Sequence, residues 1–425
     1  MTELTRRNFT VLAGASFAAL STPLFAPRAL GQAKPKVVVI GGGPGGATVA
    51  KYVAKDGGLD VTLVEPARQF TTCFHSNLFV GGIRTWESIT HSYGKLTSKY
   101  GIKHVRQAAQ AVDREKRTVR LANGTVLPYD RLLIAPGVDL KFDSVPGYSE
   151  AASEKMPHAW RAGPQTQLLR RQLNAVADGG VIVMIAPDNP YRCPPGPYER
   201  ASVMAHVLKA KGHKKSRIII LDAKAAFSKQ ALFMESWQKH YPGLIEWQDA
   251  KMHGGVKSVD PKTMTVVTGL ATYKAALANV IPNQMAGKIA RDAGLANPSG
   301  FCPINPENMK STIDPNIYIV GDACIAGDMP KSAFAANSQA KVAAMMIRGD
   351  LVSARTFPAR YNNTCWSFIE TDDTVKIGGS YQAKDGKIAA VETFVSKPGE
   401  SAELRKQTQG ENMGWYTGFT ADVFS

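Results

Sequence analysis

A glycine-rich turn between a buried strand and a helix constrains the fold of this chain more than any other segment. Residues 36–40 read KVVVI, an apolar strand, and GGGPGG follows before a helix-forming run at residues 47–54. Gly41 allows a tight turn, Gly43 lets the backbone approach a pyrophosphate, and Gly46 permits close packing of the helix on the strand. The helix N-terminus then faces the anion. This order of elements predicts a Rossmann-like dinucleotide-binding domain.

The second strand of this unit ends in an acidic residue. Residues 59–64 read LDVTLV, and Glu65 follows, nineteen residues beyond Gly46. A carboxylate at that position can accept hydrogen bonds from both ribose hydroxyls of an adenosine. The combination of strand, turn, helix, second strand and terminal acid is far more specific than the glycine pattern alone.

Two distant segments indicate that the dinucleotide is FAD. Residues 317–323, IYIVGDA, resemble the second FAD motif of flavoproteins with two dinucleotide domains, in which the aspartate, here Asp322, meets the ribityl chain. Residues 132–137, LLIAPG, resemble the crossover strand of those proteins and end at Gly137. The chain is therefore similar to the glutathione-reductase-like flavoproteins, and we expect it to bind FAD.

The second dinucleotide domain of that superfamily normally binds NAD(P)H, and residues 179–185, GGVIVMI, form the strand that should open it. The glycines that should follow are replaced by APDNPYRCPPGP at residues 186–197. Prolines offer no N–H to a phosphate, and Asp188 would repel one. A later apolar strand at residues 217–221 indicates that the domain fold persists. We therefore expect a vestigial NAD-like domain and an electron donor other than NAD(P)H.

Five segments spread over the chain share a further resemblance. They are TTCFHSNLFVGG at residues 71–82, RCPPGPYERAS at 192–202, VGDACIAGDMPKSAFAANSQAKVAA at 320–344, NNTCWSFI at 362–369 and GWYTGFTADVF at 414–424. Through them the chain closely resembles the flavoprotein subunit of flavocytochrome c sulfide dehydrogenase, over essentially all of the sequence after the first thirty-three residues. The fold implied is α/β, with two Rossmann-like domains of the glutathione-reductase type and a C-terminal α+β domain.

The resemblance implies roles for three of the five cysteines. Cys193 and Cys365 would form a redox-active disulfide beside the flavin, and Cys73 would be bonded through its sulfur to the flavin 8α-methyl group, which makes the FAD covalent. Hydrosulfide is a soft anion that attacks disulfide sulfur, so an exchangeable pair beside the flavin suits an electron path from sulfide. The same resemblance places Trp415 near the flavin. The alternatives are buried, unreactive thiols and, for Trp415, interface packing.

Three residues near these motifs are further candidates. Glu199 lies six residues after Cys193, and its carboxylate could move protons as thiols form and react, or could only stabilise the dipole of its helix. Lys331 and Ser332 begin an expected helix that runs to Ala344, with its N-terminus toward the flavin pyrimidine oxygens. They would contact the flavin there or serve only as an ordinary helix cap.

The remaining cysteines suggest a structural bond. Cys302 and Cys324 flank the strand that leads into the second FAD motif, and we predict a disulfide between them, with two free thiols as the alternative. The eight histidines are scattered without metal-ligand spacing, so we assign no metal. No CxxCH motif occurs, so any haem must belong to a partner subunit.

The first thirty-three residues indicate an export signal. Arg6 and Arg7 precede an apolar stretch at residues 11–20, and small residues at 31–33 suit a signal peptidase. Ten or so apolar residues fall short of the roughly 20 that a spanning helix needs. We predict twin-arginine export to the periplasm and no membrane span. The formal net charge of +16 comes from dispersed residues, which argues against nucleic-acid binding.

The expected domains and function follow from these motifs. Residues 34–150 and 272–355 should form a discontinuous FAD domain, 151–271 the vestigial NAD-like domain, and 356–425 the C-terminal domain. The leading hypothesis is a sulfide dehydrogenase subunit that passes electrons to a c-type cytochrome subunit, in a heterodimer. One alternative is an enzyme like sulfide:quinone oxidoreductase, although the tail from Val395 to Glu411 is polar. The other is a non-catalytic accessory flavoprotein of a sulfur-oxidising complex.

Overall fold

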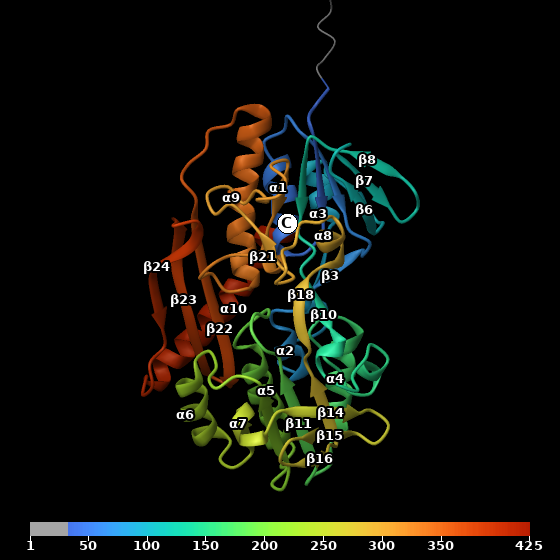
Figure 1. Ribbon diagram of the computed structural model, residues 1–425. Helices are drawn as coiled ribbons and strands as arrows, with labels where there is room; N and C mark the ends of the chain where they lie inside the picture. Colours follow the sequence, from blue (N-terminus) through green and yellow to red (C-terminus); the bar gives the residue numbers. More distant parts are fainter. Residues whose placement is uncertain (1–32) are drawn as a thin grey trace, which may run out of the picture. The chain divides into compact units, whose positions relative to one another are not determined.

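A five-stranded parallel sheet opens the computed structural model, which describes residues 33–425 (Figure 1). α1 (Pro44–Ala54) joins the first two strands and packs against the long helix α9 (Ala333–Val352). The central strands are apolar and buried, as a parallel sheet covered by helices requires. The predicted signal lies outside the described residues except for Ala33. In spatial order the strands are β20 (Ile317–Ile319), β9 (Arg131–Ile134), β1 (Lys36–Ile40), β2 (Asp60–Val64) and β5 (Lys103–Val105).

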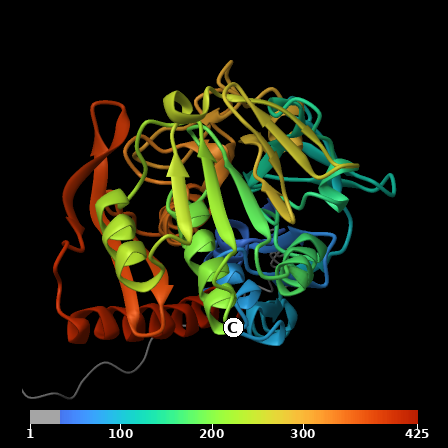
Figure 2. The same ribbon diagram turned by 90° about the horizontal axis from the view of Figure 1, so that it is seen from below.

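A second parallel sheet, of four strands, follows in the middle of the chain. Figure 2 shows its strands (green to yellow) next to one another. α4 (Pro164–Ala175) and α5 (Gly196–Ala210) pack against it, and α6 (Gln230–His240) follows its second strand in the chain. In spatial order the strands are β13 (Ile245–Gln248), β12 (Arg217–Asp222), β11 (Val181–Ala186) and β17 (Leu277–Val280).

The division between the two sheets lies later in the chain than the sequence analysis placed it. β17 pairs in parallel with β11, with Leu277 opposite Ile182, so this strand belongs to the second sheet and not to an FAD domain beginning at residue 272. The partner strand is remote in sequence, which is why the local pattern did not reveal the pairing. The chain leaves and re-enters the first sheet through the antiparallel pair β10 (Val138–Lys141) and β18 (Asn283–Ala286).

The C-terminal segment forms an antiparallel three-stranded sheet followed by a long helix (red in Figure 2). Asp385 (φ 51°) and Gly386 (φ 72°) form the second hairpin turn, and positive φ at both positions matches the twist of the paired strands. The helix is capped by Ser401, whose Oγ accepts the Leu404 N–H at 3.3 Å, and packs on β23 and α1. The elements are β22 (Arg360–Glu370), β23 (Asp373–Lys384), β24 (Lys387–Val395) and α10 (Ala402–Phe424).

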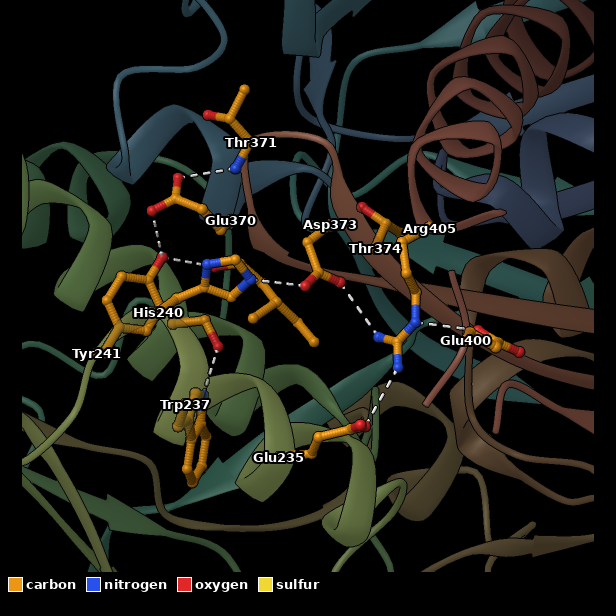
Figure 3. A network of polar contacts seen from close by, with 12 residues as sticks. Glu235, Trp237, His240, Tyr241, Glu370, Thr371, Asp373, Thr374, Glu400 and Arg405 are labelled. Atoms are coloured by element: carbon orange, nitrogen blue, oxygen red, sulfur yellow. Dashed lines mark hydrogen bonds and ion pairs between the residues drawn. The ribbon is translucent and has the colours of Figure 1, made fainter. Parts of the chain in front are cut away.

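A buried ion-pair network fastens this sheet to its neighbours (Figure 3). The guanidinium of Arg405, on α10, lies 3.1 Å from Asp373 and 3.0 Å from Glu400, and 3.5 Å from Glu235 of α6. The other carboxylate oxygen of Asp373 lies 2.7 Å from His240 Nε2, also on α6. The strand pair β22 and β23 is thereby held against the helix that follows β12.

Shorter elements complete the described part of the chain. Among residues 33–425, no helix is both long enough and apolar enough to cross a membrane. The two parallel sheets and the C-terminal antiparallel sheet confirm the predicted fold class. The shorter elements are β3 (Gln69–Thr71), α2 (Ser76–Val80), β4 (Thr90–Ser92), α3 (Gly94–Tyr100), β6 (Ala109–Asp113), β7 (Thr118–Leu121), β8 (Val126–Pro128), α7 (Ala250–His253), β14 (Val256–Asp260), β15 (Thr265–Thr268), β16 (Thr272–Lys274), α8 (Lys288–Asp292), β19 (Cys302–Pro303) and β21 (Cys324–Ile325).

Candidate functional site

The glycine turn after β1 has the tight geometry that its sequence predicts. Gly41 has a φ of 98°, in the region that favours glycine. A Cβ on Gly46 would lie 1.8 Å from the carbonyl oxygen of Gly41, so α1 meets the turn too closely for any side chain. At Gly43 a Cβ would meet only the ring of Phe70, at 3.5 Å, so the protein itself does not require glycine there. That face of Gly43 is available for a ligand.

Glu65 lies beyond the end of β2, beside this turn. Its Oε2 accepts a hydrogen bond from the Gly42 N–H (2.8 Å), and its Oε1 accepts one from the Ala67 N–H (2.9 Å). Each carboxylate oxygen keeps a second lone pair, so ribose hydroxyls can still donate to it. The Tyr93 hydroxyl donates to the Gly42 carbonyl at 3.0 Å and fixes the turn from the other side.

The turn opens onto a cavity that we call the dinucleotide cavity. At its far end Asp322 follows β20, and its carboxylate lies 3.7 Å from the Arg192 guanidinium. Gly137 has a φ of 65°, and its carbonyl accepts the Gly287 N–H at 3.0 Å, which fixes the crossover loop. The residues of the predicted site that line this cavity are Gly41, Gly43, Glu65, Cys73, Gly137 and Asp322, together with Arg192 and Ala333.

A second cavity, the cysteine cavity, adjoins the first. Cys73, Arg192 and Ala333 line both cavities, so the two meet at these residues. Cys193, Cys365, Glu199, Ser332 and Trp415 also line the cysteine cavity. Three cysteines from distant parts of the chain therefore gather beside the predicted flavin position, as the resemblance implied.

Cys193 is held by its backbone in an uncommon conformation. It has a φ of 59°, in the left-handed region, and its N–H donates to the Lys331 carbonyl at 2.8 Å. Its own carbonyl accepts the Gly196 N–H at 2.8 Å, at the start of α5. Burial raises the pKa of the Cys193 thiol well above its usual range, and the nearby acidic groups of Cys365 and Glu199 raise it further.

Cys365 lies on β22 and is linked to the start of α9. Asn363 Nδ2 lies 3.5 Å from the Cys365 sulfur, and Asn363 Oδ1 accepts the hydroxyl of Ser332 at 2.5 Å. Ser332 Oγ also accepts the Ala335 N–H at 3.0 Å, so it caps α9 as well as lining the cavity. Cys193 and Cys365 are both free thiols in this structure, so the disulfide predicted between them is not formed in it.

Glu199 lies in the first turn of α5 and faces the cysteine cavity. Burial raises its pKa, opposed by hydrogen bonds from the Phe368 N–H (2.9 Å) and Asn77 Nδ2 (2.7 Å). A buried carboxyl with a raised pKa beside thiols is suited to take up and return protons. Both partners lie outside α5, so the side chain is oriented by the site rather than by its own helix.

Lys331 does not contact the flavin position in the way that we expected. Its ammonium donates to the carbonyls of Asp322 (2.8 Å) and Cys324 (2.7 Å) and lies 4.1 Å from the centre of the Phe301 ring. These acceptors hold the side chain beneath the second FAD motif, and the residue lines neither cavity. Its contribution to the site is its carbonyl, which anchors Cys193.

The disulfide expected between Cys302 and Cys324 is not formed in the structure. The two residues are register partners on the short parallel strands β19 and β21, and both are fully buried free thiols. The Cys324 thiol instead donates to the Gly321 carbonyl at 3.1 Å, with Gln339 Oε1 at 3.5 Å.

Cys73 and Trp415 form one wall of the cysteine cavity. Trp415, on α10, packs edge-on to Phe74 (ring centres 5.9 Å apart) and against Trp366 of β22 (5.2 Å). His75 follows at a φ of 62° and is buried, and burial lowers its pKa to about 3. The C-terminal helix thus closes the cavity over the segment that carries Cys73.

A separate groove leads from the surface to Cys365. Its lining includes Pro194 and Pro195, next to Cys193, and Cys365 itself. Phe394 of β24, also in the lining, is 45% exposed, so the groove is open to solvent. A small anion can therefore reach Cys365 without passing through the dinucleotide cavity.

Besides Arg192, which lines both cavities, two further basic residues at or beside the site were not predicted. Arg200 is 2% exposed, and its guanidinium donates to the carbonyls of His158 (2.8 Å) and Ala159 (2.7 Å). It lies in the segment RCPPGPYERAS, so a signal for it existed. Lys229, 8% exposed, donates to Ser367 Oγ at 2.7 Å, and nothing in its local sequence distinguishes it from a surface lysine.

The cavities fit an FAD molecule. The close approach of Gly46 to the Gly41 carbonyl leaves backbone rather than side chain at the pyrophosphate position. In the wall of the cysteine cavity, Trp160 Nε1 and His75 Nδ1 are buried without a partner within the described chain, and flavin carbonyl and ring atoms could satisfy such groups. Cys73 lies where the two cavities meet.

Comparisons with known proteins place this arrangement in a family. The family description "Sulfide dehydrogenase [flavocytochrome c] flavoprotein chain, central" matches residues 166–282, and "Flavocytochrome c sulphide dehydrogenase, flavin-binding" matches residues 357–424. "Pyridine nucleotide-disulphide oxidoreductase" matches residues 35–183. A flavoprotein chain of flavocytochrome c sulfide dehydrogenase from Chlorobaculum thiosulfatiphilum is 58% identical over 43 residues, which cover 10% of this chain and 90% of that sequence. The chain belongs to the flavocytochrome c sulfide dehydrogenase flavoprotein family.

More distant relatives of this flavoprotein are sulfide:quinone oxidoreductases. The mitochondrial enzyme of Mus musculus is 20% identical over 320 residues, covering 72% of this chain and 69% of that sequence. The solved structure of sulfide:quinone oxidoreductase from Aquifex aeolicus has a TM-score of 0.73 at 19% identity, covering 92% of this chain and 91% of that one. At that identity the structural likeness shows the shared fold.

Proposed function

We propose that this flavoprotein oxidises sulfide through a Cys193–Cys365 disulfide and a bound FAD, and passes the electrons to a c-type cytochrome subunit. The observation that carries the proposal is the meeting of the dinucleotide cavity with the cysteine cavity at Cys73. The family is sulfide-oxidising, and its descriptions supply the flavocytochrome context. We place the protein in the periplasm because of the predicted twin-arginine signal.

The first step takes place at the cysteine pair. Hydrosulfide enters by the open groove and attacks one sulfur of the disulfide, forming a new S–S bond while the bond between the cysteines breaks. One cysteine then carries a persulfide, and the other leaves as a thiolate. In this exchange the sulfide sulfur gives up an electron pair and is oxidised, and the disulfide accepts that pair and is reduced. The persulfide proton passes to Glu199, which faces the pair.

FAD would be held by the glycine turn, Glu65 and Asp322, and attached covalently at Cys73. When bound, FAD supplies a two-electron acceptor that can release its electrons one at a time, as a haem partner requires. Trp415 and Ser332 line the cavity that would contain the ring system. NAD(P)H is not the donor in this scheme, because Pro187, Asp188 and the prolines that follow replace the glycine turn of the second sheet.

Anaerobic mixing of the purified protein with sulfide tests the proposal. Wild-type flavin should bleach with sulfide but not with NADH, whereas Cys193→Ser and Cys365→Ser should keep their FAD and lose the reaction with sulfide. Cys302→Ala is the matched control, since this buried thiol lies outside both cavities. Near-native sulfide oxidation in both serine variants would show that the disulfide route is wrong.

The electron acceptor separates the alternatives. A sulfide dehydrogenase should reduce a c-type cytochrome, whereas an enzyme like sulfide:quinone oxidoreductase should reduce a water-soluble quinone faster. A protein whose flavin reacts with neither sulfide nor cytochrome would instead be an accessory flavoprotein. Co-purification with a haem-bearing subunit from cells that naturally produce the protein would identify the proposed partner directly.

A further inference from the structure

Lys229 is a buried lysine aimed at the strand that carries Cys365. It precedes α6, has a φ of 63° and is 8% exposed. Its ammonium donates to Ser367 Oγ at 2.7 Å and to the Cys365 carbonyl at 3.2 Å. A left-handed conformation is unfavourable for a residue with a Cβ, so the surrounding structure must hold it. The conformation directs the side chain into the protein.

Within residues 33–425 the positive charge of Lys229 has no carboxylate partner. Among the described residues, no carboxylate oxygen lies within ion-pair distance of its ammonium, whereas buried Lys224 lies 2.6 Å from Asp222. A buried charge without a counter-charge is unfavourable. Neutral oxygens satisfy the N–H donors of Lys229 but do not balance its charge. The fold therefore retains a cation here that needs an anion in at least one state of the protein.

The acidic groups that face Lys229 belong to the cysteine cavity. Burial lowers the pKa of Lys229 to about 8, while Cys365 on β22, Glu199 on α5 and Cys193 in the preceding loop act in the opposite direction. Phe233, on α6, faces it with its ring centre 6.0 Å away. Lys229 in turn lowers the pKa of the Cys193 thiol, which burial and the other acidic groups raise.

The two nearby arginines are already engaged elsewhere. The Arg200 guanidinium donates to backbone carbonyls and to Asn77 Oδ1 at 3.0 Å. Arg192 donates to the Trp160 carbonyl and pairs with Asp322. Among these three described cations only Arg192 has a carboxylate partner, and Arg200 is held by carbonyl and amide oxygens of other segments, whereas the Lys229 ammonium bonds to Cys365 itself, through its carbonyl.

We propose that Lys229 is a positioning residue that stabilises the thiolate released when the Cys193–Cys365 pair is reduced. The inference rests on the proposed function only in that the pair must cycle between disulfide and dithiol. During hydrosulfide attack, the negative charge moves from the incoming anion to the departing cysteine sulfur. Lys229 would lower the energy of that product and orient β22 through Ser367.

Thiol alkylation of the dithiothreitol-reduced holoprotein tests the proposal without sulfide or cytochrome. Peptide mass spectrometry would follow iodoacetamide labelling of Cys193 and Cys365 across pH. Lys229→Met should slow labelling at neutral pH about tenfold, which corresponds to a rise of about one pH unit in the midpoint of the profile. Lys229→Arg should restore most of the rate. Lys209→Met is the matched control, because this exposed lysine lies on α5 and pairs with Glu370.

The variants also separate charge from structure. Lys229→Gln keeps a donor for Ser367 without the charge and should label as slowly as Lys229→Met, so either neutral variant that folds provides the test. Profiles of the neutral variants that coincide with wild type would overturn the proposal. Because labelling involves no sulfide, a wild-type protein that fails to oxidise sulfide but shows the Lys229 effect would overturn the proposed function and leave this inference standing.

Discussion

Replacing Gly46 by alanine is the sharpest test of the dinucleotide site. A Cβ there would lie 1.8 Å from the Gly41 carbonyl oxygen and 3.3 Å from Val39 Cγ1. Because real Cβ contacts are not shorter than 3.0 Å, α1 must move away from the turn by about 1 Å. Overpacking of this kind destabilises a fold by about 1–3 kcal/mol, and a shift of about 1 Å can cost about 10²-fold where geometry matters. The N-terminus of α1 would no longer meet the pyrophosphate.

The assay compares flavin content and urea unfolding. We expect purified Gly46→Ala to contain less than about a tenth of the wild-type FAD, because FAD must bind at the turn before Cys73 can attach it, and to unfold at lower urea. Gly410→Ala is the control: no atom lies within 4 Å of a Cβ there, and alanine within α10 should stabilise by about 0.5–1 kcal/mol. If Gly46→Ala bound FAD fully and unfolded like wild type, the turn would not be the pyrophosphate site.

Three further predictions concern the cysteine cavity and its support. Glu199→Gln should slow sulfide-driven flavin reduction about 10²-fold. Because burial raises the pKa of Glu199, the wild-type rate should fall as the pH drops through that pKa. Stopped-flow measurements across pH should show this fall in wild type and not in the variant. Arg405→Met leaves the buried carboxylate of Asp373 without this partner and should lower the free energy of unfolding in urea by about 3–5 kcal/mol. Lys406→Met, which removes an exposed ion pair, should lower it by less than about 1 kcal/mol. Equal losses of stability in the two variants would show that the buried network does not stabilise the fold. Cys73→Ser should release FAD into the supernatant on acid precipitation, while wild type retains it in the pellet; a colourless wild-type pellet would rule out the thioether.

Much of the first domain could be predicted from sequence because its signals are local. Gly46 is constrained by contacts with Gly41 and Val39 within one strand–turn–helix unit, and Glu65 follows at the end of the next strand. The replacement of the second glycine turn by prolines could also be recognised from the local sequence alone. The cysteine assignments came from resemblance, since Cys193 and Cys365 lie on different elements and no local pattern relates them.

The sequence by itself therefore determined those strands, turns and helices that short-range sterics and apolar periodicity specify. Only the tertiary structure assigned β17 to the second sheet rather than to the FAD domain, because its pairing with β11 is a long-range contact. It also decided that the Lys331 ammonium donates hydrogen bonds to two carbonyls. The same holds for the hydrogen bond from the Cys324 thiol to the Gly321 carbonyl and for the burial of Lys229 beside Cys365. The direction and burial of a side chain depend on the elements packed around it, and those elements come from parts of the chain that no local window contains.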